Sequence, residues 1–155
     1  MLLTLLIEFV VAFFATAAFS VLFSVPRKQW LFAGLTGGTG WIFYRGMTAG
    51  SGLVAATFIA VVVVTLISRI FAVVRKSPVT IFLVPGIFPL VPGVGIYYTS
   101  YYFIMNEFSL ASAKGIETMK IAVAITLGIM CVLLIPQRVF LLLEARKRLH
   151  FRRKG

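Results

Sequence analysis

The sequence predicts an all-α integral membrane protein with about five transmembrane helices, the fourth of them broken. Hydrophobic residues make up 61% of the 155 residues and charged residues only 12%, whereas soluble domains carry roughly 25% charged residues. Most of the apolar runs approach or exceed the roughly 20 residues that a membrane-crossing helix needs. We expect a single transmembrane domain over residues 1–143, with spans at about 2–25, 29–45, 53–74, 79–105 and 119–143, and a basic cytoplasmic tail over 144–155.

Basic residues set the expected orientation, because Lys and Arg concentrate on the cytoplasmic side of membrane proteins. With five spans and the N-terminus outside, twelve of the 15 Lys and Arg residues fall at or inside the cytoplasmic face. The span at 29–45 is short, so four spans are the alternative, but that topology leaves only ten basic residues inside. The tail contributes much of the net charge of +11, and we expect it to bind the anionic inner leaflet rather than nucleic acid.

The span at 2–25 is expected to be retained, because Glu8 stands where a cleavable signal peptide carries basic residues. The next span carries a helix face almost without side chains, formed by Gly34, Gly37, Gly38 and Gly40. Such a face lets a neighbouring backbone approach closely. We therefore expect these glycines to pack against another helix, with the lining of a substrate path as the alternative.

The span at 53–74 contains a β-branched run over 61–65 and is expected to be scaffold. Arg69 lies about a turn and a half before Arg75 and Lys76, so its side chain could reach the inner headgroups by snorkelling. The alternative is that Arg69 faces an anionic solute.

The span at 79–105 contains the most informative segment, Pro85-Gly86-Ile87-Phe88-Pro89-Leu90-Val91-Pro92-Gly93. Three prolines within eight positions cannot continue one straight helix, because proline lacks an N–H and clashes with the preceding turn. At about 1.5 Å per residue, the segment falls near the middle of a core about 30 Å thick. Irregular backbone at that depth is tolerated where protein buries it or where it lines a water-filled cavity, as in transporters.

A helix that restarts near Gly93 and Gly95 would present free N–H groups, which favour an anion such as a carboxylate. The predicted substrate path also includes Tyr97 and the break residues Pro85, Gly86, Pro89 and Pro92. A plain kink without binding and a re-entrant packing element remain open. The tyrosines at 97, 98, 101 and 102 fit either an anchoring belt at the outer interface or a solute gate.

The polar stretch over 106–120 is expected to connect the last two spans outside the membrane. Proton coupling would call for an acid within the membrane, and Glu117 is the best local candidate. The alternative is an interfacial ion pair with Lys114 or Lys120 at helical spacing.

Catalytic and metal chemistry are poorly supported. The sequence has one cysteine, Cys131, and one histidine, and it lacks a phosphate-binding loop and the His-Glu-x-x-His spacing. We expect no enzyme activity, no metal and no cofactor. Without a nucleotide loop, the energy for transport would come from a gradient or a partner.

The chain resembles the threonine/serine exporter (ThrE) family, specifically the short membrane subunit of its split form, which is similar to the small subunit of a bacterial succinate exporter. The residues that carry the resemblance are Val25-Pro26, the glycine-rich second span ending near Trp41, Lys76-x-Pro78 and Pro89-Leu90-Val91-Pro92-Gly93-x-x-x-Tyr97. The resemblance implies a multi-pass protein of the bacterial plasma membrane that works with a larger membrane subunit of the same family. It also implies export of small hydrophilic metabolites, with threonine/serine and dicarboxylates both represented.

Three functions are then in competition. The leading hypothesis is the small subunit of a secondary exporter, either with the larger partner or as a homo-oligomer. The second is a structural or assembly subunit that does not itself transport, and the third is a channel, for which no ring of charged side chains is evident.

Overall fold

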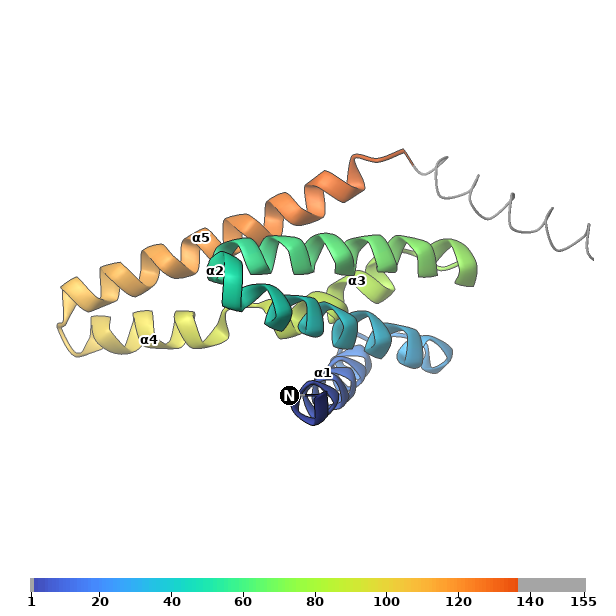
Figure 1. The fold of residues 1–155 in the computed structure, drawn as a ribbon, viewed down its shortest axis with the longest axis horizontal. Coiled ribbons are helices and arrows are strands. Elements are labelled where there is room, and N and C mark those ends of the chain that lie inside the picture. Colours follow the sequence, from blue (N-terminus) through green and yellow to red (C-terminus); the bar gives the residue numbers. More distant parts are fainter. Residues whose placement is uncertain (1, 137–155) are drawn as a thin grey trace, which may run out of the picture.

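The computed structural model describes residues 2–136, which form α-helices joined by short turns and contain no strand (Figure 1). The all-helical class is therefore confirmed for this part of the chain. By length and apolarity three helices could cross a membrane, or four if one bent pair forms a single span. The predicted tail and the end of the predicted last span lie outside the described residues. The elements are α1 (Leu2–Leu22), η1 (Arg27–Gln29), α2 (Trp30–Arg75), α3 (Thr80–Ile87), η2 (Phe88–Leu90), α4 (Gly93–Ile104) and α5 (Phe108–Leu133).

Helix α2 folds back on itself at Gly52, whose φ of 74° and ψ of 167° are not helical. The two arms, 30–51 and 53–75, lie side by side in Figure 1, and they correspond to the predicted spans at 29–45 and 53–74. The first arm is longer than expected, because residues 46–51 continue the helix up to the reversal.

Replacing Gly52 with alanine is expected to destabilise this reversal. The backbone region that Gly52 occupies is essentially restricted to glycine, and a side chain there costs about 1–3 kcal/mol. Gly50→Ala is the matched control, since Gly50 is helical and a Cβ there meets no atom within 4 Å. That change should be neutral or stabilising, by up to about 1 kcal/mol. Thermal melting of both variants in detergent checks that Gly52→Ala lowers the melting temperature and that Gly50→Ala does not. Equal melting temperatures would contradict this prediction.

The glycine face of the first arm packs against α1. A Cβ at Gly34 would lie 2.8 Å from the Phe13 ring, and one at Gly38 would lie 2.9 Å from the Phe9 ring. A Cβ at Gly37 would overlap the Thr16 side chain. Gly40 instead approaches Val64 of the second arm, within the core of the bundle, which contains Ala60, Val61, Val64, Leu83 and Leu90.

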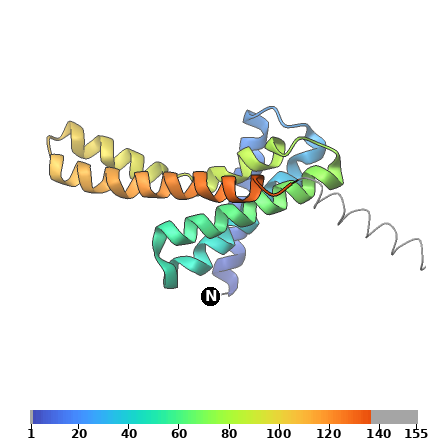
Figure 2. The same cartoon turned by 90° about the horizontal axis from the view of Figure 1, so that it is seen from above.

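The last helix differs from the prediction. Residues 106–120 were expected to form a connection, but α5 begins at Phe108 and includes most of that stretch. Its serines and charged residues are exposed along the helix, and a helix accommodates them without a break. The helix ends at Leu133, ahead of Pro136, and the expected end of this span at 143 lies outside the described residues. The first part of α5 pairs with α4 in a hairpin whose tip extends away from the other helices (Figure 2). The second part packs on the second arm of α2, where Gly128 lies against Phe58 and Val61.

Arg69 has a role that neither sequence alternative anticipated. Its side chain is buried, with 9% relative exposure of the residue. Its Nη1 donates to the carbonyl oxygens of Val132 and Ile135, both at 2.6 Å, and of Leu133 at 3.3 Å. A helix leaves its last carbonyls without intrahelical donors, so Arg69 caps the C-terminal end of α5 from the second arm of α2.

A second set of polar contacts joins the turn before α2 to the turn after it. The amide of Gln29 donates to Ser77 Oγ at 3.0 Å, and Arg75 Nε donates to Gln29 Oε1 at 3.0 Å. The Arg75 guanidinium also lies 4.6 Å from the centre of the Phe32 ring. This α2-end tie (Gln29, Arg75 and Ser77) holds both ends of α2 together.

Candidate functional site

The helix break is real but shorter than expected. Helix α3 continues through Pro85 and Gly86, both buried, because a single proline removes only one intrahelical hydrogen bond. The chain becomes extended only at Val91, whose ψ is 130°. Helix α4 then begins at Gly93, and the two halves are bent by 51°. The predicted break over 85–93 is therefore confined to the residues just before Gly93.

The N-terminal end of α4 offers fewer free donors than expected. The N–H of Gly93 donates to the Val91 carbonyl at 2.8 Å, and that of Ile96 donates to the Pro92 carbonyl at 3.0 Å. The N–H groups of Val94 and Gly95 have no backbone acceptor among the described residues. These two amides are the ones available to a ligand at the start of the helix.

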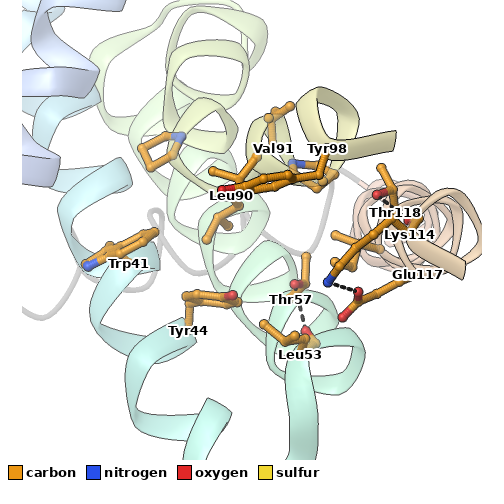
Figure 3. Close-up of a pocket in the computed structure, with 16 residues that line it drawn as sticks. Trp41, Tyr44, Leu53, Thr57, Leu90, Val91, Tyr98, Lys114, Glu117 and Thr118 are labelled. Carbon is orange, nitrogen blue, oxygen red and sulfur yellow. Dashed lines mark hydrogen bonds and ion pairs between the residues drawn. The ribbon is translucent and has the colours of Figure 1, made fainter. Parts of the chain in front are cut away.

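A cavity of about 420 Å³ lies at this break (Figure 3). Its volume falls within the roughly 300–1,000 Å³ typical of small-molecule sites. The walls come from the break itself, from both arms of α2 and from α5, and they combine aromatic and apolar side chains with a few polar groups. Residues that line this first cavity include Trp41, Tyr44, Thr57, Pro89, Pro92, Gly93, Gly95, Tyr98, Lys114, Glu117 and Thr118.

An ion pair stands at the edge of the first cavity. Lys114 Nζ lies 2.9 Å from Glu117 Oε2, one helical turn away on α5. Both side chains are more than 40% exposed, so the pair contributes little to stability.

A second cavity, of about 660 Å³, adjoins the first between α1 and the first arm of α2. The two share Trp41, Tyr44, Leu53 and Pro89. Glu8 and Arg45 also line the second cavity. Arg45 Nε donates to Glu8 Oε2 at 2.8 Å, and Trp41 Nε1 donates to the same oxygen at 3.2 Å.

Comparison with known families decides the identity of this broken-helix bundle. The family model described as Threonine/Serine exporter, ThrE, matches residues 8–135, which is most of the chain.

The chain belongs to the threonine/serine exporter family.

The resemblance to this family, carried by the Pro-Leu-x-Pro-Gly segment, is thus confirmed, and the short subunit of the split form stays a prediction. Membership places the chain among multi-pass membrane transporters rather than enzymes. No curated protein and no solved structure matches the sequence.

Four of the residues predicted for the substrate path line the first cavity of this exporter-family protein, namely Pro89, Pro92, Gly93 and Gly95. Gly86 lies elsewhere, since a Cβ there would lie 2.9 Å from Thr36. Pro85 is buried in α3 and does not line the cavity. Tyr97 is 62% exposed and stacks on Tyr101, with ring centres 6.2 Å apart.

Two aromatic lining residues were not anticipated as part of a site. Trp41 and Tyr44 lie one turn apart, directly after the glycine-rich stretch of the first arm, and their rings pack together with centres 5.3 Å apart. Tyr98, one of the tyrosines for which a solute gate was the alternative, lines the cavity, whereas Tyr97 does not. The aromatic pair at spacing three, directly after the glycines, was the available signal. The sequence does not show which helices face each other, so it could not place the pair beside the break.

The α4–α5 hairpin is the least covered part of the exporter. No residue of α4 is buried. Apolar side chains at the hairpin tip are largely exposed, among them Phe103 at 62% and Ile104 at 73%. Contiguous exposed apolar surface of this kind faces lipid or another protein.

Proposed function

We propose that this chain is the small membrane subunit of a secondary exporter for small hydrophilic carboxylates, such as threonine/serine-type amino acids or dicarboxylates like succinate. The observation that carries the proposal is the cavity at the broken span, where the start of α4 meets aromatic and polar side chains from three other helix segments. Broken helices that place polar backbone beside a cavity are characteristic of solute sites in transporters.

The membrane topology in this proposal has five crossing segments. The two arms of α2 each cross, and the bent pair of α3 and α4 crosses once. The N-terminus is outside and the C-terminus is in the cytoplasm of a bacterium. The distribution of Lys and Arg in the sequence supports this orientation.

The partner in this proposal is a larger membrane subunit of the same family. The uncovered α4 supports it, since a transport path bounded by a helix with no buried residue needs a further wall. A homo-oligomer could supply that wall instead. Expression of the chain alone and together with the larger subunit, followed by size determination in detergent, distinguishes the two assemblies.

Gly93→Leu is expected to reduce export of threonine or succinate at least tenfold without loss of protein. Gly93 lines the first cavity, and a Cβ there meets no atom within 4 Å. Leucine is therefore expected to occupy space at the cavity without disturbing the packing. Gly95 is unsuitable for this test, because its Cβ would overlap Thr118. Export from cells that express the variant, measured as solute in the medium per unit of membrane protein, gives the result.

The control is Gly46→Leu, which also meets no atom within 4 Å but does not line the first cavity. It should export like the wild type. Normal export by Gly93→Leu would instead support an assembly subunit that does not itself transport, since such a subunit needs only to fold and to bind its partner.

A further inference from the structure

Glu8 stands apart from the other acidic residues of the chain. The sequence contains four acids; Glu144 lies outside the described residues, Glu107 is exposed at the turn before α5, and Glu117 pairs with Lys114 on its own helix. Glu8 lies inside the apolar helix α1 and pairs with Arg45 on a different helix. Ionisable residues inside membrane helices are costly, and they usually mark solute or proton pathways.

The depth of the pair supports a position within the hydrocarbon core. At about 1.5 Å per residue, Glu8 lies roughly 21 Å from Leu22, and Arg45 lies roughly 22 Å from Trp30. In the proposed orientation, Leu22 and Trp30 mark the inner ends of their helices. Both charges then fall at the same level of a core about 30 Å thick, and the start of α4 lies close to that level.

Helix packing does not explain the pair. The contacts of Gly34, Gly37 and Gly38 already bring α1 against α2. An ion pair contributes little net stability when it is solvent-accessible, and within a membrane core the cost of removing two charges from water offsets their attraction. The Glu8 and Arg45 side chains also keep 23% and 47% of their exposure, and both line the second cavity. The pair is therefore accessible from a space that adjoins the first cavity.

We propose that Glu8 and Arg45 form a proton-linked carboxylate site. The guanidinium contacts Glu8 through Nε, and its two Nη groups can receive a second carboxylate in the bidentate geometry that arginine favours. When a solute carboxylate binds the Arg45 guanidinium in place of Glu8, Glu8 loses its positively charged partner. An unpaired carboxylate in apolar surroundings is costly, so Glu8 takes up one proton from water in the cavity.

The charge balance favours this exchange. The resting site contains one carboxylate and one guanidinium, and the loaded site contains one guanidinium, one solute carboxylate and a neutral Glu8. Counting only the solute carboxylate that binds the guanidinium, these groups sum to zero charge in both states, which lowers the cost of loading the site in the membrane core. The ammonium of threonine and the second carboxylate of succinate are outside this count and need partners elsewhere in the cavities. Trp41 Nε1 can donate to Glu8 in either form. The other ionisable group among the described residues that line this cavity is Tyr44.

The inference rests on the proposed function, because it assumes that the solute carries a carboxylate. What it proposes in addition is that Arg45 binds this carboxylate and that Glu8 binds one proton with each solute. Amino acids and dicarboxylates share this chemistry, so L-threonine and succinate are both used as probes.

The test measures the affinity of the purified protein, with any subunit that copurifies, for each probe at a series of pH values. For the wild type, affinity should fall by up to about tenfold per pH unit towards alkaline pH, because one proton binds with each solute. Glu8→Gln mimics the neutral acid, so its affinity should be independent of pH and, at neutral pH, tighter than that of the wild type. Arg45→Gln should lose affinity at every pH. Glu107→Gln is the control and should keep the wild-type dependence.

Each outcome has a defined meaning. A pair that only joins α1 to α2 would lower the melting temperature of Glu8→Gln and leave the pH dependence of binding unchanged, which overturns the inference while the exporter proposal stands. A wild type that binds and exports neither probe overturns both. If Glu8→Gln does not fold, proton uptake by the wild type decides, measured on addition of solute in weak buffer. Uptake of about one proton per solute supports the inference, and no uptake overturns it.

Discussion

Gly37→Leu is expected to be the most damaging substitution in the described part of the chain. A Cβ at this position already overlaps Thr16, whose residue is fully buried in α1 and whose Oγ1 donates to the Ala12 carbonyl at 2.8 Å. Thr16 is β-branched and held by that hydrogen bond, so its side chain cannot turn aside easily. Leucine would force α1 away from the first arm of α2. Overpacking costs about 1–3 kcal/mol and occasionally more, and we expect this position at the upper end of that range because the clash starts at the Cβ itself.

The measurement is thermal or denaturant unfolding in detergent, together with hydrogen exchange of α1. Gly46→Leu is the matched control on the same arm. No atom lies within 4 Å of its Cβ, and leucine is a better helix former than glycine by somewhat under 1 kcal/mol, so the control should be neutral or slightly stabilising. Equal stability of the two variants would show that α1 does not pack on the glycine face.

Arg69→Met is expected to release the end of α5 and to destabilise the protein by about 3 kcal/mol. Hydrogen bonds to charged groups contribute about 1.5–3 kcal/mol each, and a buried polar group left without a partner costs a similar amount. The substitution removes the donor to the carbonyls of Val132 and Ile135. Methionine keeps much of the side-chain volume, so the decrease in the free energy of unfolding reports on the lost hydrogen bonds.

Hydrogen exchange and unfolding of the same variant provide the readout. Amides in the last turn of α5 should exchange faster, while those near Phe108 should be unaffected. Lys28→Met is the control, because Lys28 is an exposed cation in η1. If Arg69 acted only by snorkelling to headgroups, both variants would show the same small change.

The sequence predicted the elements of this fold better than their relative positions. Apolar runs marked the helices, and the prolines marked the broken span, because these signals are local. The start of α5 was missed, since Ser109 and Lys114 read as loop residues although a helix tolerates them at an exposed position. The break was placed too broadly, because Pro85 is accommodated within α3.

The sequence did not predict which helices are neighbours. A helix that is apolar all round has no single face to mark its buried side, and α1 and α2 are of this kind. The distance from Glu8 to Arg45 and the cap that Arg69 places on α5 both depend on how each helix is rotated about its axis. For the same reason, Pro89, Pro92, Gly93 and Gly95 were identified from the sequence, whereas Trp41, Tyr44 and Thr57 needed the three-dimensional arrangement.

The α2-end tie and the Arg69 cap gather their polar contacts at one end of the bundle. Gln29, Arg75 and Ser77 fasten the ends of α2, and Arg69 fastens the last turn of α5 to the same region. Among residues 2–136, no such polar contact joins the tip of the α4–α5 hairpin to the other helices, and α4 joins α3 through the bend at Val91 and Pro92. The hairpin is thus held at one end only, by Arg69 and by the packing of the second part of α5 on the second arm of α2, while its tip projects from the bundle.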